Sequence, residues 1–425
     1  MSNQTYTLIK ECFASISLAL HWIASKFSRR EDRFKYYCDD ITGTSFTLSC
    51  LANIYKEGYA KFNPILWKHR MENPLESIDN IIASFDDGLQ YDKYIEGFLN
   101  VLLEPIPPHT KLNHDLERVV WGCHHCRHRF ECLYVFKELA SYLDPQAYKA
   151  PRSLNYRIFM NFHSKIANVL ERYLIRSDGG TGWPFNIKDQ TIDPYVTARL
   201  LNFFFDWNDK IEEFRFRKDF SKNSDIFNEC LETLKNIQNK ETLVKKYNIV
   251  DELDVKGAWR EIQWGDFEVW RVKGASHIAE ILYKIEGRKS REIENAKSFI
   301  DRACQGALSA VDAAIFSDCY TATVSDITGT IGVVDFYLAV GEKFDINARS
   351  SVIIDRIKWL LNEQRVDGAW PVLSKDFWFK ASQNRPDILR QRIFTEEQMN
   401  LNNVSICNTM LMLQTLIRFL KKSLE

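Results

Sequence analysis

The segment from residue 121 to residue 132 reads WGCHHCRHRFEC and is rich in side chains that bind transition metals. Cys123 and Cys126 form a C-x2-C pair, which can give two thiolates to one zinc ion. His128 or Cys132 could complete three ligands. Structural zinc sites usually draw a second pair from a distant segment, and the sequence has no second C-x2-C. Two interpretations stay open: a zinc site, and a polar helix start with buried thiols.

Aspartates precede several apolar runs and are the candidate acids of the chain. The string Asp-Ile-Thr-Gly-Thr begins at both Asp40 and Asp326, and Asp193 begins a looser version, DPYVT. An aspartate at this position can cap a helix by accepting a backbone N–H. A buried carboxyl can instead donate a proton during catalysis. The sequence favours capping, and Asp40, Asp193 and Asp326 are the catalytic candidates if the protein is an enzyme.

Tryptophans stand at glycine-containing turns in three places, at Trp183, Trp259 and Trp370. A tryptophan at such a position can plug a hairpin turn and pack on the next unit, which is the favoured interpretation. It can also present a stacking face to a ligand such as a sugar. These three residues are therefore the candidate ligand-binding aromatics.

The elements that would position these residues are helical hairpins. In residues 355 to 370 a helical pattern runs through Ile357, Leu360 and Leu361 and stops at Asp367-Gly368, and a second helical run begins near Val404. Residues 166 to 183, followed by a run from Asp193, have the same order. Inner helices are predicted to start near residues 42, 195, 275, 328 and 404, and residues 76 to 143 are predicted to supply a sixth hairpin. Six hairpins closing on themselves predict an all-α fold, a single α/α toroid.

Composition supports one helical domain. The 425 residues include only 17 Gly and 11 Pro, and such a scarcity of helix breakers favours helices over turn-rich β architecture. No linker rich in Pro, Gly or Ser divides the chain. We therefore expect one domain over residues 1–425, with insertions at 208–256 and 376–400.

The turn after residue 355 carries a known pattern. Trp359-Leu360, Gln364, Gly368 and Trp370 have the spacing aromatic-Leu-x3-Gln-x3-Gly-x-Trp. This pattern resembles the QW repeat of squalene and other terpene cyclases, whose wider superfamily includes the protein prenyltransferases. A second copy near Tyr173 departs from the pattern, because Asp178 replaces the glutamine and no spacer precedes Trp183. The resemblance implies an α/α toroid.

The catalytic motifs of these families are missing. Class II terpene cyclases protonate an alkene with an Asp-x-Asp-Asp acid, and neither Asp39-Asp40 nor Asp86-Asp87 completes that motif. Asp40 and Cys50 are too far apart to match the zinc-binding Asp-x-Cys of prenyltransferases. The resemblance therefore supports the predicted fold more strongly than it supports a catalytic activity.

Charge and cysteine usage exclude some classes of protein. The net charge is −1 and basic residues do not cluster with aromatics, so nucleic acid is not an expected partner. Ten scattered cysteines are typical of reduced thiols and indicate a cytoplasmic protein. Residues 12 to 24 resemble the apolar part of a signal peptide but lack a cleavage site, and we expect no membrane span.

Two functions fit these observations. In the first, the toroid lacks the usual catalytic motifs and acts as a binding or scaffold protein for a protein segment or an apolar ligand. In the second, it is an active enzyme on an isoprenoid-like or carbohydrate substrate, using cavity aspartates. The missing motifs favour the first.

Overall fold

The structure is a computed structural model of the whole chain. It describes residues 3–28, 33–34, 170–184, 191–208, 224–240, 255–263, 267–304, 313–316, 320–323, 326–340, 351–371, 374 and 406–424. Helices dominate this part of the chain, as the sequence predicts.

The longer helices are α1 (Asn3–Lys26), α8 (Pro194–Asn208), α9 (Asp225–Asn236), α10 (Val272–Glu286), α11 (Arg291–Cys304), α12 (Asp326–Val340), α13 (Ser351–Asn362) and α17 (Ile406–Leu424). The described strands are β1 (Phe27–Ser28), β2 (Arg33–Phe34), β3 (Ile175–Ser177), β4 (Gly180–Gly182), β5 (Glu261–Gln263), β6 (Phe267–Trp270), β7 (Ala313–Phe316) and β8 (Tyr320–Thr323). The predicted helix starts near 195, 275, 328 and 404 correspond to α8, α10, α12 and α17.

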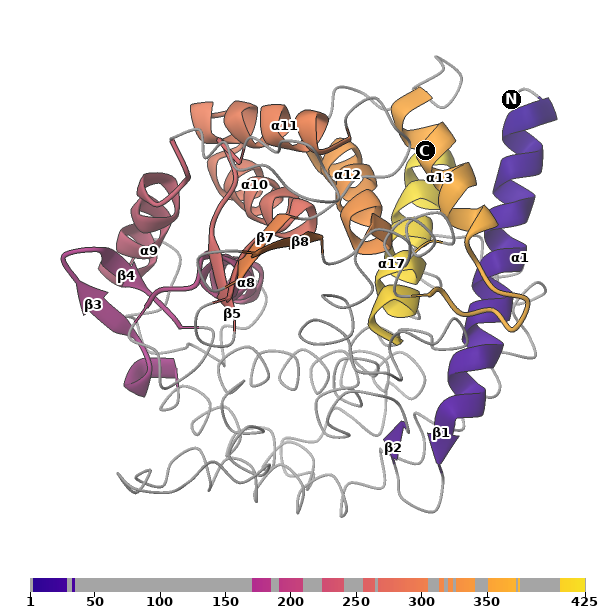
Figure 1. Cartoon of the computed structure of the whole chain (residues 1–425), viewed down its shortest axis with the longest axis horizontal. Coiled ribbons are helices and arrows are strands. Elements are labelled where there is room, and N and C mark those ends of the chain that lie inside the picture. Colours follow the sequence, from indigo (N-terminus) through magenta and orange to yellow (C-terminus); the bar gives the residue numbers. More distant parts are fainter. Residues whose placement is uncertain are drawn as a thin grey trace. The chain divides into compact units, whose positions relative to one another are not determined.

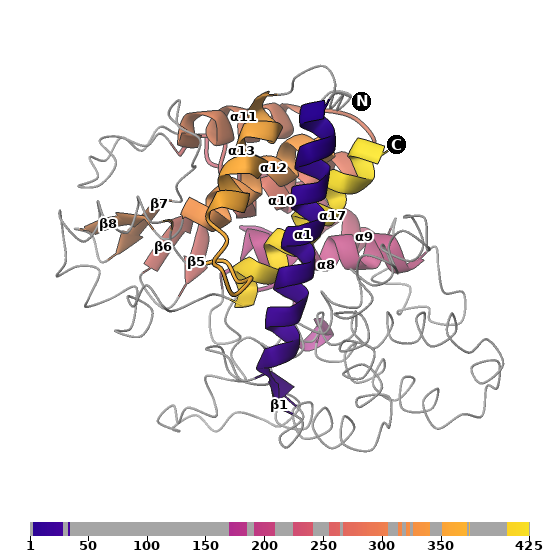
Figure 2. The same cartoon turned by 90° about the vertical axis from the view of Figure 1, so that its right-hand side faces the viewer.

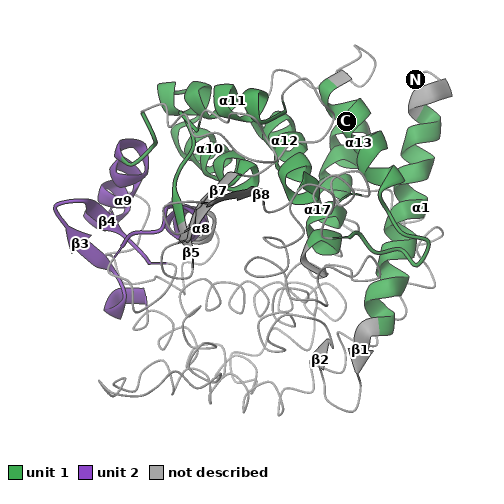
Figure 3. Ribbon diagram, in the orientation of Figure 1, with its two compact units in different colours: residues 1–26, 57–75, 237–425 green, residues 27–56, 76–236 purple. Residues whose placement is uncertain are grey.

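Backbone contacts divide the chain into two compact units. The first unit consists of residues 1–26, 57–75 and 237–425, and the second of residues 27–56 and 76–236 (Figure 3). The expectation of a single domain stays a prediction. The expected insertion at 208–256 contains α9, whereas the one at 376–400 lies outside the described residues.

In the first unit, α10, α12 and α17 form a parallel layer. The Thr328 hydroxyl bonds to the Asn408 side chain, and the Thr415 hydroxyl bonds to Asp335. Both pairs are separated by 80 residues along the chain, so α12 and α17 run in the same direction. Helix α12 also packs closely on α10. A Cβ on Gly332 would lie 2.7 Å from the backbone of Lys273, so this contact requires glycine.

A second layer covers these helices. Helix α11 packs on α10 and α13 packs on α12, while α1 packs on both α17 and α13 (Figure 1). Helix α11 packs through one apolar face. The buried residues of that face recur at helical spacing: Ile293, Ala296, Phe299, Ile300 and Ala303. By contrast, the buried residues of α12 lie on every side of the helix, which is expected for a helix enclosed by other helices.

Helix α1 brings the N-terminal end of the chain against its last helix (Figures 1 and 2). Its buried residues recur every three or four positions, and they include Cys12, Ile16, Ala19 and Ile23. Among the described residues, one stretch, Tyr6–Ser25, has the length and composition of a membrane span, but 56% of its apolar window is buried inside the protein. This stretch is buried because α1 packs against α13 and α17 in the core.

The loops that precede α10 and α12 each form a β-hairpin. Strands β5 to β8 make one antiparallel sheet in the order β5-β6-β7-β8, so the two hairpins pair with each other (Figure 2). The sequence analysis did not anticipate this sheet. In the second unit, β3 and β4 form a hairpin that packs on α9, and α9 packs on α8.

Candidate functional site

Trp370 fixes the turn between α13 and α17. Its side chain is fully buried, and its indole Nε1 donates to the carbonyl of Leu360 at 2.7 Å. Its backbone N–H donates to the Thr409 hydroxyl at 3.0 Å. One residue thus joins the end of the outer helix to the first turn of the inner helix.

Gln364 and Gly368 attach the same turn to α1. The Gln364 amide donates to the Gly368 carbonyl at 2.8 Å and to the Ser15 carbonyl at 3.0 Å, and the Ser15 hydroxyl donates back to Gln364 at 2.5 Å. Gly368 has φ +97°, and a Cβ there would lie 2.3 Å from the Leu18 carbonyl oxygen. The residues that carry the QW-like pattern therefore form one structural joint between α13, its turn and α1.

The second hairpin repeats these bonds in the other unit. The Trp183 indole Nε1 donates to the Leu170 carbonyl at 2.8 Å, and the Trp183 backbone N–H donates to the Thr197 hydroxyl at 3.0 Å. Trp183 is fully buried. The two turns therefore share the same pair of tryptophan hydrogen bonds, although the second lacks the glutamine.

Asp193 lies directly before α8 and caps it. Its carboxyl oxygen Oδ1 accepts the Val196 N–H at 2.8 Å, and its backbone N–H donates to the Trp183 carbonyl at 2.9 Å. Asp193 is 1% exposed. This bond is that of a helix N-cap, which gives the Asp193 carboxyl a structural role.

Asp326, the first residue of α12, is buried and holds the segment that follows Trp370. Its Oδ1 accepts the Ser374 N–H at 2.9 Å, and its Oδ2 accepts the Ser374 hydroxyl. Burial raises the pKa of Asp326 to about 6, although the bonds from Ser374 oppose that increase. With a pKa of about 6, Asp326 gains and loses its proton close to neutral pH.

Polar side chains around Asp326 hold Trp370, Pro371 and Ser374 in place. The Asn408 amide donates to the Pro371 carbonyl at 2.8 Å and its oxygen accepts from Thr328. With the Trp370–Thr409 and Ser374–Asp326 bonds, these three residues are held on both α12 and α17. We call Asp326, Thr328, Ser374 and Asn408 the strap cluster.

Trp259 is also buried, at 1% exposure. The backbone beside it is fixed by an Asn239 N–H bond to the Ala258 carbonyl and a Gly257 N–H bond to the Asn239 carbonyl, each 2.8 Å long. All three candidate aromatics thus lie in packed turns. None of them presents an open stacking face to solvent.

The other candidates lie outside the described residues: Asp40 and the metal candidates Cys123, Cys126, His128 and Cys132. Within the part of the chain that the structure describes, no cluster of His, Cys, Asp or Glu could hold a metal ion. The zinc site in the 121–132 segment stays a prediction.

The sequence analysis missed a charged cluster between α10, α12 and α17. Lys273 Nζ donates to Asp335 Oδ2, and the Thr415 hydroxyl donates to Asp335 Oδ1 at 2.9 Å. Arg418 contacts Asp335 at 3.7 Å. Both members of the Lys273–Asp335 pair are buried.

Glu280 and His277 of α10 extend this cluster. Arg418 meets both carboxylate oxygens of Glu280, at 3.1 and 3.2 Å, and His277 Nδ1 lies 3.6 Å from Glu280. Burial alone would raise the pKa of Glu280, but Arg418 and His277 together hold it well below its usual range. We call Lys273, His277, Glu280, Asp335, Thr415 and Arg418 the inner charge network.

A signal for this network was present in the sequence. Lys273, His277 and Glu280 are spaced i, i+4 and i+7, which places them on one face of a helix. Asp335 interrupts the apolar run of α12. The sequence could not show that these residues meet, because they come from helices separated by long stretches of chain.

Glu261 of β5 is a further buried acid. It is 1% exposed, and its Oε2 pairs with Arg271 at 3.2 Å. Its other carboxyl oxygen has no hydrogen-bond partner among the described residues and lies against Gly274. Burial raises the pKa of Glu261, while Arg271 opposes that increase.

Comparison with known proteins assigns this chain neither a family nor an activity. The chain matches no protein-family model and no curated protein sequence. It is similar to the solved structure of a type II terpene cyclase, MstE from Scytonema, in complex with its substrate geranylgeranyl dihydroxybenzoate. That similarity covers 98% of each chain at 13% sequence identity, with a TM-score of 0.46. At this level it assigns no activity to the protein.

Proposed function

We propose that the hairpins of this chain close into an α/α toroid. The parallel layer of α10, α12 and α17, each partnered by a covering helix, is the arrangement that such a ring requires. The packing of the first helix, α1, on the last, α17, supports closure because it joins the two ends of the hairpin series.

The toroid acts as a binding or scaffold protein for a protein segment or an apolar ligand. The observation that carries this proposal is that the candidate residues make bonds within the fold. Trp183 and Trp370 donate their indole N–H groups to helix-end carbonyls, and Asp193 caps a helix. These three side chains stabilise the hairpins and are therefore occupied by structural bonds.

One observation favours the alternative, an enzyme on an isoprenoid-like or carbohydrate substrate. Asp326 is buried, and its pKa near 6 allows it to carry a proton close to neutral pH. The Ser374 hydroxyl and N–H would then orient the acid.

Incubation with squalene and with a mixed oligosaccharide set separates the two functions. The binding proposal predicts saturable quenching of tryptophan fluorescence by squalene, no new product, and the same affinity in Asp326→Asn. Product that forms with the wild type and disappears in Asp326→Asn would establish the enzyme instead. The variant's far-UV circular dichroism, measured in parallel, controls for folding.

A further inference from the structure

Glu261 is a buried acid to which neither proposed function gives a role. It is the first residue of β5 and is 1% exposed. One of its carboxyl oxygens, Oε2, pairs with Arg271 at 3.2 Å, whereas Oε1 has no hydrogen-bond partner among the described residues. A buried polar atom without a partner is rare in proteins and calls for an explanation.

The unpaired oxygen lies where the hairpin of β5 and β6 meets α10. A Cβ on Gly274, in the first turn of α10, would lie 1.9 Å from Oε1. Any larger residue at this position would therefore have to displace the carboxyl group. Arg271, the N-cap residue of α10, makes no capping bond with its side chain and contacts Oε2 instead. Glu261 thus connects the base of the hairpin to the start of α10.

This geometry disfavours the ionised form of Glu261. A charged oxygen that is buried without a donor loses its hydration and gains no bond in return. The start of α10 and the Arg271 guanidinium both favour the anion, but the Arg271 side chain is 28% exposed, so water screens its charge. Burial outweighs Arg271, and the pKa of Glu261 is raised above its ordinary value of 4.5.

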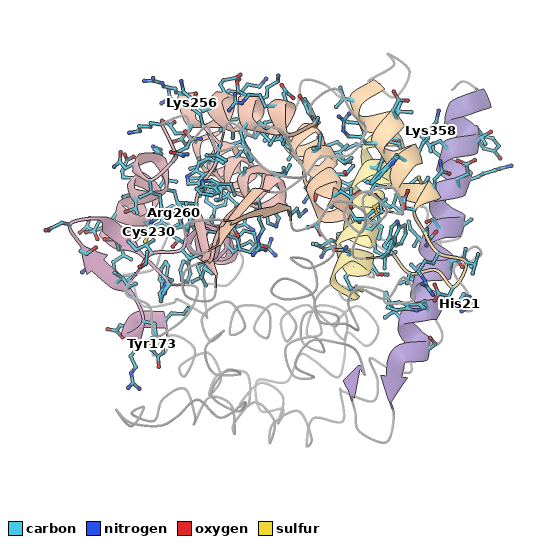
Figure 4. All side chains as sticks on the ribbon, viewed as in Figure 1. His21, Tyr173, Cys230, Lys256, Arg260 and Lys358 are labelled. Carbon is cyan, nitrogen blue, oxygen red and sulfur yellow. The ribbon has the colours of Figure 1, made fainter. Side chains whose placement is uncertain are left out.

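The other charged residues of this hairpin and of the first turn of α10 have other surroundings. Arg260, next to β5, is exposed (Figure 4). Lys273 of α10 bonds within the inner charge network. Glu268 of β6 stands opposite a different residue of β5 in the strand register. Within the described part of the chain, Arg271 is therefore the charge that is paired with the Glu261 carboxyl.

We propose that Glu261 is a proton-dependent latch between the β5–β6 hairpin and α10. With its proton, the neutral carboxyl stays buried against Gly274 and holds the hairpin on the helix. Without the proton, the carboxylate leaves this contact for water, and the base of the hairpin separates from α10. Because β6 also pairs with β7, opening the latch also affects the hairpin that precedes α12. The latch does not depend on the proposed function.

Native-state hydrogen exchange of the β5 and β6 amides, corrected for their intrinsic rates, tests the latch. Opening exposes Glu261 and returns its pKa to about 4.5, so opening releases a proton above that pH. In the wild type, the opening equilibrium constant should rise about tenfold per pH unit from about pH 4.5 up to the pKa of the folded state, and then stay constant. In Glu261→Gln, which keeps the shape of the protonated acid, the constant should not change with pH over this range.

Two further variants make the test specific to this carboxyl. Glu294→Gln is the matched control, because Glu294 is exposed on α11, and it should keep the wild-type pH dependence. Arg271→Gln removes the charge that favours the anion, so the tenfold rise should continue to a higher pH than in the wild type. A wild type without the rise, or a Glu261→Gln variant that keeps it, would overturn the latch. Loss of the rise in Glu294→Gln, or an unchanged end point in Arg271→Gln, would overturn it as well.

Discussion

At the scale of single residues, the same side-chain type serves equivalent roles in both units. Trp183 and Trp370 each donate an indole N–H to a helix-end carbonyl and a backbone N–H to a threonine in the next helix. Tryptophan suits this position because its side chain both fills the turn and donates to a helix-end carbonyl that has no partner within the helix. Function has to be sought among residues that are not consumed in this way.

Replacing either tryptophan by phenylalanine tests this role. Trp370→Phe and Trp183→Phe keep most of the apolar volume but leave the Leu360 or Leu170 carbonyl without its donor. Each should lower the free energy of unfolding by about 1–3 kcal/mol in urea denaturation. Losses below about 0.5 kcal/mol in both would show that the indole bonds are not structural.

Asp326 should give the protein a measurable pH dependence. Its pKa is raised from 3.8 to about 6 in the folded state, so the folded protein binds this proton more tightly than the unfolded chain. The contribution of Asp326 to stability is therefore full below pH 3.8 and is lost as pH rises through about 6. The wild type should lose about 3 kcal/mol relative to Asp326→Asn between those limits. The measurement is the free energy of unfolding of both proteins in urea at each pH. A difference between them that stays constant across this range would contradict the prediction.

Zinc in the 121–132 segment is tested by the metal content of the purified protein. If Cys123 and Cys126 bind zinc, the wild type should contain about one ion per chain, and both Cys123→Ser and Cys126→Ser should lose it. If wild-type protein purified without chelator contained no metal, the prediction of a zinc site in this segment would be wrong.

At the scale of elements, the joint between α1 and the turn at 364–370 depends on two particular residues, Gln364 and Gly368. Gln364 bonds to both Ser15 and Gly368, and Gly368 touches the backbone of α1. The glutamine and glycine of the QW-like pattern thus have a physical basis here: one bridges two elements, and the other permits their close approach.

Gly368→Ala should disrupt this joint. The added Cβ would meet the Leu18 carbonyl oxygen, and φ +97° is strained for any residue with a side chain. We expect a loss of about 1–3 kcal/mol in thermal or urea unfolding. Val366→Ala, at a fully exposed position of the same turn, is the control and should change stability by less than about 0.5 kcal/mol. Equal behaviour of the two variants would rule out the joint.

At the scale of the whole molecule, the packing of α1 on α17 makes the N-terminal helix part of the core. Native-state hydrogen exchange should show α1 amides opening with the same free energy as those of α12. Exchange of α1 at a much lower free energy would indicate that it frays independently and does not close the hairpin series.

Local sequence determined the helices, the hairpin turns at Gly368-Ala369-Trp370 and Gly182-Trp183, and the capping role of Asp193, because periodicity, glycine and capping act within a few residues. Only the tertiary structure decided that Gln364 meets Ser15, that Asp326 holds Ser374 and that Lys273 pairs with Asp335. These pairs are 349, 48 and 62 residues apart. A helical period states which face is buried but not which partner covers it, so the inner charge network became visible only when α10, α12 and α17 were packed together.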